Sequence, residues 1–274
     1  AICQPPLGKG AKAASGGKQF AKLKFVLIFP FLCATMGKHQ KGGDFMRIAG
    51  LQKCTLLDYP GKVACTVFLG GCNLRCPFCH NASLVLPRGE APLLREEEFF
   101  EFLGKRQGIL DGVCVTGGEP LLYPSVGDFL ARIRAMGDLV KLDTNGTMPD
   151  RLSALLLEKA VDYVAMDIKS SPEGYEAACG LPVDVEKIKR SIALIRESGI
   201  PHEFRTTVVK GLHTEERMRA IGMWLGDVPH YFIQNFSDRG EILTEGLSGF
   251  TPSELEGLLA AVKPSIPSAK IRGL

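Results

Sequence analysis

One short stretch decides how the rest of this chain is understood: residues 70–81, Gly-Gly-Cys-Asn-Leu-Arg-Cys-Pro-Phe-Cys-His-Asn. It places Cys72, Cys76 and Cys79 at the spacing C-x3-C-x2-C. Disulfides consume cysteines in pairs, so one of three thiols in so short a loop would always be left over. Three thiolates can instead point at one metal centre.

Two kinds of metal centre are open to these thiols. A structural zinc site is closed by four ligands, and the nearest candidate for the fourth, His80, directly follows Cys79 and is poorly placed to turn back onto the same ion. A cubic [4Fe–4S] cluster offers four irons that each take one outer ligand. Three cysteines would leave one iron open for chemistry, so the spacing favours a cluster over zinc or a disulfide.

Length and composition bound the other possibilities. The 274 residues suffice for one domain with a sizeable core, with or without an appendage. The net charge of +3 is too small to indicate a nucleic-acid partner. Free thiols beside a cluster predict a reducing compartment, and we expect the cytoplasm. The remaining cysteines show no second metal spacing: Cys3, Cys33, Cys54, Cys65, Cys114 and Cys179.

The beginning of the chain differs from the rest. An apolar run, Phe25–Cys33, follows two lysines in the outline of a signal peptide. Pro30 interrupts this run, which is far shorter than the ~18–20 residues of a membrane span. We therefore expect residues 1–45 to be a disordered or non-native extension without membrane association. Met46 is expected to begin the working domain, residues 46–274.

From Met46 onward, strand patterns alternate with helix patterns. The alternation predicts a parallel sheet with right-handed connections, although the pattern alone does not distinguish an open sheet from a barrel. The predicted strands are 63–69, 112–116, 139–143, 163–168, 204–209 and 231–236. The predicted helices are 93–104, 125–136, 149–160, one capped by Asp184, one opened by Thr214, and one from a capping box at Thr251 to Val262.

Three of these strands end in motifs. The first ends in Thr116–Pro120, T-G-G-E-P, whose glycines make a turn or let backbone approach a ligand closely. The next ends in Asp143–Gly146, D-T-N-G, where Asn-Gly is a turn signal. The third carries Asp167 and Lys169, which share one side of the strand. Because buried unpaired charge is costly, we expect these two side chains to pair.

Together these motifs resemble those of the radical S-adenosylmethionine (SAM) enzymes, and among them the glycyl-radical-enzyme activating enzymes. The resemblance covers Met46 to the C-terminus and rests on C-x3-C-x2-C-H-N, T-G-G-E-P, D-T-N-G and D-x-K. It implies an α/β fold, a partial (β/α)6 TIM-like barrel with its site at the carboxyl ends of the strands. It also implies an anaerobic oxidoreductase that cleaves SAM reductively, after which the 5′-deoxyadenosyl radical takes a hydrogen atom from a glycine of a partner enzyme.

The resemblance also assigns site residues and cofactors. It implies one [4Fe–4S] cluster and SAM, with the cluster ligands, which are also the catalytic residues, being Cys72, Cys76 and Cys79. The implied SAM-binding residues follow the cysteine loop and the strands: Phe78, Gly117, Gly118, Glu119, Asp143, Thr144, Asp167, Lys169 and Arg205. Within that set, Asp143, Thr144 and Asp167 are expected to form a monovalent cation site that touches the SAM carboxylate.

Two further segments indicate which group of activating enzymes the chain resembles most. Residues 51–62, Leu-Gln-Lys-Cys-Thr-Leu-Leu-Asp-Tyr-Pro-Gly-Lys, look most like activating proteins of anaerobic (class III) ribonucleoside-triphosphate reductase, where this segment is expected near the partner-facing mouth. Residues 234–236, Gln-Asn-Phe, stand where pyruvate formate-lyase activators carry Pro-Tyr-His. The expected partners are therefore the anaerobic reductase and, as electron donor, reduced flavodoxin or ferredoxin.

Three alternatives stay open. The chain could activate another glycyl radical enzyme, such as pyruvate formate-lyase. It could act on a small molecule, as a 7-carboxy-7-deazaguanine synthase-like enzyme does. It could also be a non-enzymatic iron–sulfur carrier, although G-G-E and D-x-K would then have no role.

Overall fold

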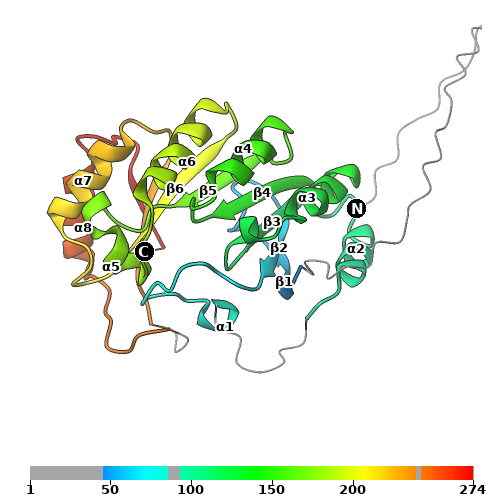
Figure 1. Cartoon of the computed structure of the whole chain (residues 1–274), viewed down its shortest axis with the longest axis horizontal. Coiled ribbons are helices and arrows are strands. Elements are labelled where there is room, and N and C mark those ends of the chain that lie inside the picture. The colour runs from blue at the N-terminus through cyan, green and yellow to red at the C-terminus, as the bar shows by residue number, and fades with distance from the viewer. Residues whose placement is uncertain (1–45, 86–92, 239–241, 274) are drawn as a thin grey trace, which may run out of the picture. The chain divides into compact units, whose positions relative to one another are not determined.

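A single eight-stranded sheet, in the order β1-β2-β3-β4-β5-β6-β7-β8, organises the chain (Figure 1). The computed structural model describes residues 46–85, 93–238 and 242–273. All of these belong to one unit, Gly43–Leu274. The expectations for residues 1–45 lie outside the described residues. Among the helices that the structure describes, none has both the length and the apolar character needed to span a membrane.

The six predicted strands are confirmed as β2 to β7, which run parallel to one another. Two further strands were not predicted: β1 pairs antiparallel with β2, and β8 parallel with β7. Three consecutive residues of β1, Gln52 to Cys54, are solvent-exposed, and β8 has only three residues, so neither forms an apolar run. The strands are β1 Ile48–Thr55, β2 Ala64–Leu69, β3 Gly112–Gly117, β4 Leu139–Thr144, β5 Tyr163–Asp167, β6 His202–Val208, β7 Tyr231–Asn235 and β8 Lys270–Arg272.

The six predicted helices are also confirmed, and their caps explain where they begin. The Asp184 side chain accepts from the Glu186 amide, the Thr214 hydroxyl accepts from the Arg217 amide, and Thr251 forms the predicted capping box. The short helices α1 Ala82–Val85 and α5 Tyr175–Cys179 were missed because they are too short to show a period. The long helices are α2 Glu96–Gly104, α3 Val126–Ala135, α4 Pro149–Leu157, α6 Val185–Glu197, α7 Glu215–Leu225 and α8 Pro252–Val262.

The helices and the cysteine loop take different sides of the sheet. In Figure 1, α3, α4, α6 and α7 follow one side of the strands, while the segment from β2 to α1 crosses the other side toward α5. A backbone hydrogen bond from Arg75 to the Cys179 carbonyl, 2.9 Å long, fixes that crossing. The architecture is the expected partial barrel, extended by one strand at each edge.

The turn between β1 and β2 closes the amino edge of the barrel. The Tyr59 side chain is buried, with its ring centroid 6.0 Å from that of Tyr163 at the start of β5. Asp58 accepts a 2.6 Å hydrogen bond from the Thr66 hydroxyl. Because β2 runs from this turn toward the cysteine loop, residues 56–62 lie at the edge opposite that loop. The expectation that this segment lies near the mouth is therefore wrong for this chain.

Candidate functional site at the carboxyl edge of the barrel

A cavity of about 270 Å³ lies where the cysteine loop meets the carboxyl ends of β3 to β7. The predicted site residues that line it are Cys72, Cys76, Phe78, Cys79, Gly117, Gly118, Asp143, Thr144, Asp167, Lys169 and Arg205. The one predicted residue outside the lining is Glu119. The lining residues that were not predicted are Leu74, His80, Asn81, Val85, Thr116, Asn145, Thr207 and Gln234. Residues far apart in sequence thus meet at one place, as expected for the carboxyl edge of parallel strands.

The two glycines of T-G-G-E-P are required by close contacts with the backbone of the neighbouring segment. The end of β3 packs against the cysteine loop, with hydrogen bonds from the Gly118 amide to the Leu69 carbonyl (2.8 Å) and from the Glu119 amide to the Gly71 carbonyl (2.9 Å). A Cβ on Gly118 would lie 1.8 Å from the Gly71 carbonyl oxygen. Gly117 has φ +119°, and a Cβ there would lie 2.3 Å from the Leu69 carbonyl oxygen. No other residue fits at either position.

Glu119 lies outside the cavity lining and holds two strand ends together. Its carboxylate is fully buried and accepts from the Leu121 amide (3.0 Å), the Thr144 hydroxyl (2.9 Å) and the Asn145 amide (2.7 Å). Burial raises the pKa of this carboxyl to about 7, against the lowering effect of its three donors. The carboxylate therefore joins the end of β3 to the loop after β4, a position that the resemblance alone did not indicate.

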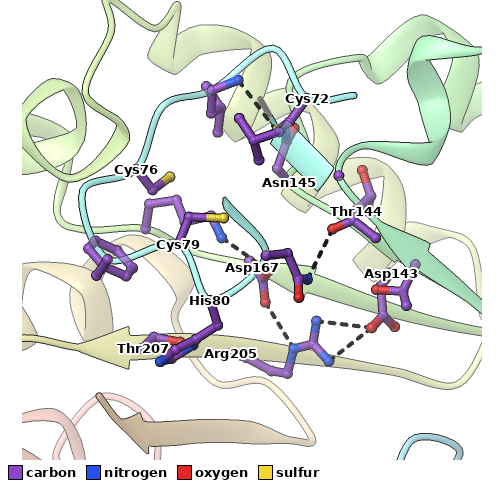
Figure 2. A pocket seen from close by; sticks show the side chains of 18 of the residues that line it. Cys72, Cys76, Cys79, His80, Asp143, Thr144, Asn145, Asp167, Arg205 and Thr207 are labelled. Atoms are coloured by element: carbon purple, nitrogen blue, oxygen red, sulfur yellow. Dashed lines mark hydrogen bonds and ion pairs between the residues drawn. The ribbon is translucent and has the colours of Figure 1, made fainter. Parts of the chain in front are cut away.

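The three loop cysteines surround one end of the cavity without meeting at a point. Within the described residues, no three side chains of His, Cys, Asp or Glu are grouped closely enough to hold a metal ion. Figure 2 shows Cys76 and Cys79 on one side of the cavity and Asp143 with Arg205 on the other. Thiols spread around a cavity wall suit a four-iron cluster, which is larger than a single ion, better than they suit tetrahedral zinc. The donor set therefore fits the implied cluster.

A fourth cysteine touches this loop. Cys179, at the end of α5, is buried against Cys76, and a hydrogen bond from Cys179 lowers the pKa of Cys76 to about 7 despite burial. Burial raises the pKa of Cys72 to about 11 and also raises that of Cys79. Gly180, with φ +67°, allows the close approach, because a Cβ there would lie 2.1 Å from the Arg75 carbonyl oxygen. Sequence spacing gave no sign of this contact.

A chain of charges forms the cavity floor (Figure 2). Arg205 donates from Nε to Asp167 Oδ1 at 2.9 Å and from both Nη atoms to Asp143 Oδ2 at 3.2 and 3.3 Å. Lys169 Nζ lies 3.1 Å from Asp167 Oδ2, which confirms the pairing predicted from their spacing. Although burial raises the pKa of both carboxyls, these cations hold it below the usual range. Both carboxylates are therefore ionised and paired.

Three further charged residues extend this floor into the barrel and were missed from the sequence. Lys141, only 1% exposed, donates to Asp143 Oδ1. Glu203 accepts from Arg272 at 2.8 and 2.7 Å and lies 3.9 Å from Arg205. The sequence offered one indication of them, because residues two positions apart in a strand share a face. Lys141 precedes Asp143, and Glu203 precedes Arg205, by two strand positions.

Aromatic and imidazole side chains complete the walls. Phe78 packs edge-on against the buried His213, with 6.2 Å between ring centroids. His213 accepts from the Val209 amide (3.1 Å) at Nδ1 and donates from Nε2 to the Lys169 carbonyl (2.9 Å), so it supports the segment that carries Lys169. His80 stacks on Phe236, with 5.3 Å between ring centroids, at the end of β7. The cysteine loop is thus tied to both β5 and β7.

Comparisons with known proteins identify the family of this chain. The family model described as "Radical SAM superfamily" matches residues 66–223. The chain is 33% identical over 200 residues, 70% of its length and 80% of the relative's, to a protein of Methanocaldococcus jannaschii described as "Putative glycyl-radical enzyme activating enzyme".

Two more distant relatives share a shorter stretch. The chain is 30% identical over 135 residues to 7-carboxy-7-deazaguanine synthase of Methanopyrus kandleri, covering 42% of this chain and 53% of that one. It is 32% identical over 142 residues to pyruvate formate-lyase-activating enzyme of Clostridium pasteurianum, covering 49% and 57%. The chain thus spans about half the length of these two relatives. The cysteine spacing, the fold, the cavity and the family match together establish that the chain is an enzyme of the radical SAM superfamily.

Proposed function

We propose that this enzyme generates a glycyl radical on a partner enzyme, most specifically on an anaerobic (class III) ribonucleoside-triphosphate reductase. The likeness to a described glycyl-radical enzyme activating enzyme along 70% of the chain carries this proposal. Residues 51–62 and the Gln-Asn-Phe sequence at 234–236 favour the reductase branch over the pyruvate formate-lyase branch.

The residues of the cavity have distinct roles in this proposal. Cys72, Cys76 and Cys79 would hold the [4Fe–4S] cluster, which when bound would supply the one electron that splits SAM into methionine and a 5′-deoxyadenosyl radical. Lys169 and Arg205 orient the negatively charged end of SAM. Gly117 and Gly118 present backbone to its amino group, and Phe78 packs beside its adenine. Because a primary carbon radical attacks whatever is nearest, these residues must hold SAM closely and keep water away.

The partner glycine gives up one hydrogen atom in the reaction. The hydrogen passes from the glycine Cα to the deoxyadenosyl carbon, so that 5′-deoxyadenosine leaves and the unpaired electron stays on the partner. Reduced flavodoxin or ferredoxin supplies the electron that starts each turnover. An oxygen-sensitive cluster and free thiols fit a reducing compartment, so we place the reaction in the cytoplasm.

Anaerobic reconstitution tests the proposal directly. With iron, sulfide, SAM and dithionite, the wild-type protein is expected to produce 5′-deoxyadenosine, and addition of a class III reductase is expected to yield a glycyl radical signal in electron paramagnetic resonance. Cys76→Ala should abolish both. Cys54→Ala, on the exposed face of β1, makes the same chemical change away from the site and should preserve both. Deoxyadenosine from Cys76→Ala would contradict the ligand assignment.

A small-molecule reaction is the second candidate, favoured by the 30% identity to 7-carboxy-7-deazaguanine synthase. The two candidates differ in where the unpaired electron ends. Cleavage of SAM that a reductase does not stimulate, with no radical on that polypeptide, would favour the small-molecule reaction.

A further inference from the structure

We propose that Lys141 and Arg205 are a built-in replacement for a monovalent metal cation, so that this enzyme binds SAM without Na⁺ or K⁺. The inference deepens the proposed function at the same site, and it concerns the cation that the resemblance implies beside Asp143, Thr144 and Asp167. The side chains of this chain do not fit such an ion.

All four carboxylate oxygens that would coordinate the ion already face cationic donors. Asp143 Oδ1 accepts from Lys141, and Asp143 Oδ2 accepts from the two Nη atoms of Arg205 at 3.2 and 3.3 Å. Asp167 Oδ1 accepts from Arg205 Nε at 2.9 Å, and Asp167 Oδ2 from Lys169 Nζ at 3.1 Å. A metal cation would have to displace ammonium or guanidinium groups that already bind these oxygens.

The third expected ligand is also engaged elsewhere. The Thr144 hydroxyl donates to Glu119 Oε1 at 2.9 Å and accepts from the Gly146 amide at 3.1 Å. Glu119 itself receives two further amide donors, so it fixes the hydroxyl in this orientation. The Thr144 hydroxyl is therefore oriented by Glu119 and by the loop after β4, with its proton and one of its two lone pairs already engaged.

The charge balance of the floor points the same way. Lys141, Lys169 and Arg205 carry three positive charges against the two of Asp143 and Asp167. Glu203 does not cancel the surplus, because its carboxylate is clamped by both Nη atoms of Arg272. One positive charge thus remains for the carboxylate of a bound ligand. An added metal cation would double that surplus inside a low-dielectric barrel, which is unfavourable.

Lys141 is the residue that occupies the Asp143 oxygen which a metal cation would otherwise use. Its side chain is 1% exposed and lies on β4, where its ammonium donates to Asp143 Oδ1 and lies 3.7 Å from Cys114 Sγ. Lys141 is therefore a positioning residue that fixes Asp143, which in turn holds Arg205 at the cavity.

SAM binding to the reconstituted, oxidised enzyme tests the inference by isothermal titration calorimetry in choline chloride, NaCl and KCl at equal ionic strength. We expect the wild-type dissociation constant to agree within about twofold in the three salts. Lys141→Met should weaken binding about tenfold or more in choline chloride, with recovery in KCl, because it frees Asp143 Oδ1. Lys105→Met, which removes an exposed ammonium paired with Glu101, is the matched control and should behave as wild type.

The comparison of wild-type SAM binding in the three salts needs no variant. It overturns the inference if binding in choline chloride is tenfold weaker than in KCl. A Lys141→Met protein with wild-type affinity in choline chloride also overturns it. A second measurement needs neither cluster nor SAM: the melting temperature of the cluster-free wild type should not differ between choline and K⁺, and a K⁺-specific rise would contradict the inference. Absence of SAM binding in every salt would instead contradict the proposed function.

Discussion

The two edges of the barrel are built from the same strands but in opposite ways. At the carboxyl edge, glycine backbone, thiols and paired charges surround a cavity of about 270 Å³. At the amino edge, the turn of residues 56–62 inserts Tyr59 beside Tyr163 and closes the barrel with aromatic side chains. The residues that line the cavity and the residues that close the barrel thus lie at opposite ends of the same strands. A change at one edge should therefore leave the other edge largely intact.

The largest effect is expected at the closest backbone contact of the carboxyl edge. Gly118→Ala would place a Cβ 1.8 Å from the Gly71 carbonyl oxygen and push the loop that begins at Cys72. We expect nearly complete loss of cluster loading, measured as iron and sulfide per chain after anaerobic reconstitution. Gly104→Ala, where the added Cβ would meet only the Met136 side chain at 3.7 Å, is the control and should load normally. Full loading of Gly118→Ala would show that the loop tolerates this displacement.

The second largest effect is expected at the amino edge and should leave the carboxyl edge unchanged. Tyr59→Ala removes a buried aromatic side chain from the amino edge and should lower the free energy of unfolding by about 3–5 kcal/mol, as measured by urea denaturation. Its cluster content under folding conditions should stay at the wild-type level, because the cysteine loop lies at the other edge. Tyr59→Phe retains the ring and should lose much less stability. A Tyr59→Ala protein that is stable but cannot load a cluster would break the comparison.

The buried carboxyl of Glu119 should make stability depend on pH. Its pKa is raised from 4.5 to about 7 in the folded protein, so between these values the folded state keeps a proton that the unfolded chain has lost. This contribution is complete below about pH 4.5 and is lost as the pH rises through 7. It amounts to about 3 kcal/mol in the free energy of unfolding of the cluster-free protein.

Glu119→Gln isolates that contribution. Urea denaturation at pH 5 and pH 8 should show a smaller decline in stability for the variant than for the wild type. Equal declines in the two proteins would show that Glu119 is ionised throughout this range.

The smallest effect is expected for the exposed side chain of Leu57. This residue is 88% exposed at the amino edge, so Leu57→Ser should change the free energy of unfolding by less than about 0.5 kcal/mol. The yield of glycyl radical on the reductase should be unchanged, because the partner glycine must reach the opposite edge. A large loss of radical with intact SAM cleavage would show that the partner also contacts the amino edge.

Much of the fold followed from local patterns. Buried apolar runs and capping residues such as Asp184 predicted the central strands and helices, because they act within a few residues of the chain. The antiparallel β1 escaped prediction because three consecutive exposed residues, Gln52 to Cys54, interrupt its apolar pattern, and β8 because it is too short. All but one of the site residues that the motifs predicted line the cavity, the exception being Glu119.

The exceptions depend on tertiary contacts that no local pattern encodes. Cys179 reaches Cys76 only because α5 ends against the cysteine loop. Glu119 turns away from the cavity because the loop after β4 offers it a hydroxyl and an amide. Lys141 could be placed on the same face as Asp143 by its spacing, but the absence of a free carboxylate oxygen for a metal cation became visible only once Arg205 lay between the two aspartates.

Arg272 connects the last strand to this floor and affects which carboxylates Arg205 can pair with. Its guanidinium clamps Glu203 and lies 3.6 Å from the Phe232 ring centroid. Without Arg272, the nearly fully buried Glu203 would have Arg205, 3.9 Å away, as its nearest cation and would compete for it with Asp143 and Asp167. The edge strand β8 thus keeps the guanidinium of Arg205 available to the cavity by occupying a carboxylate that would otherwise attract it.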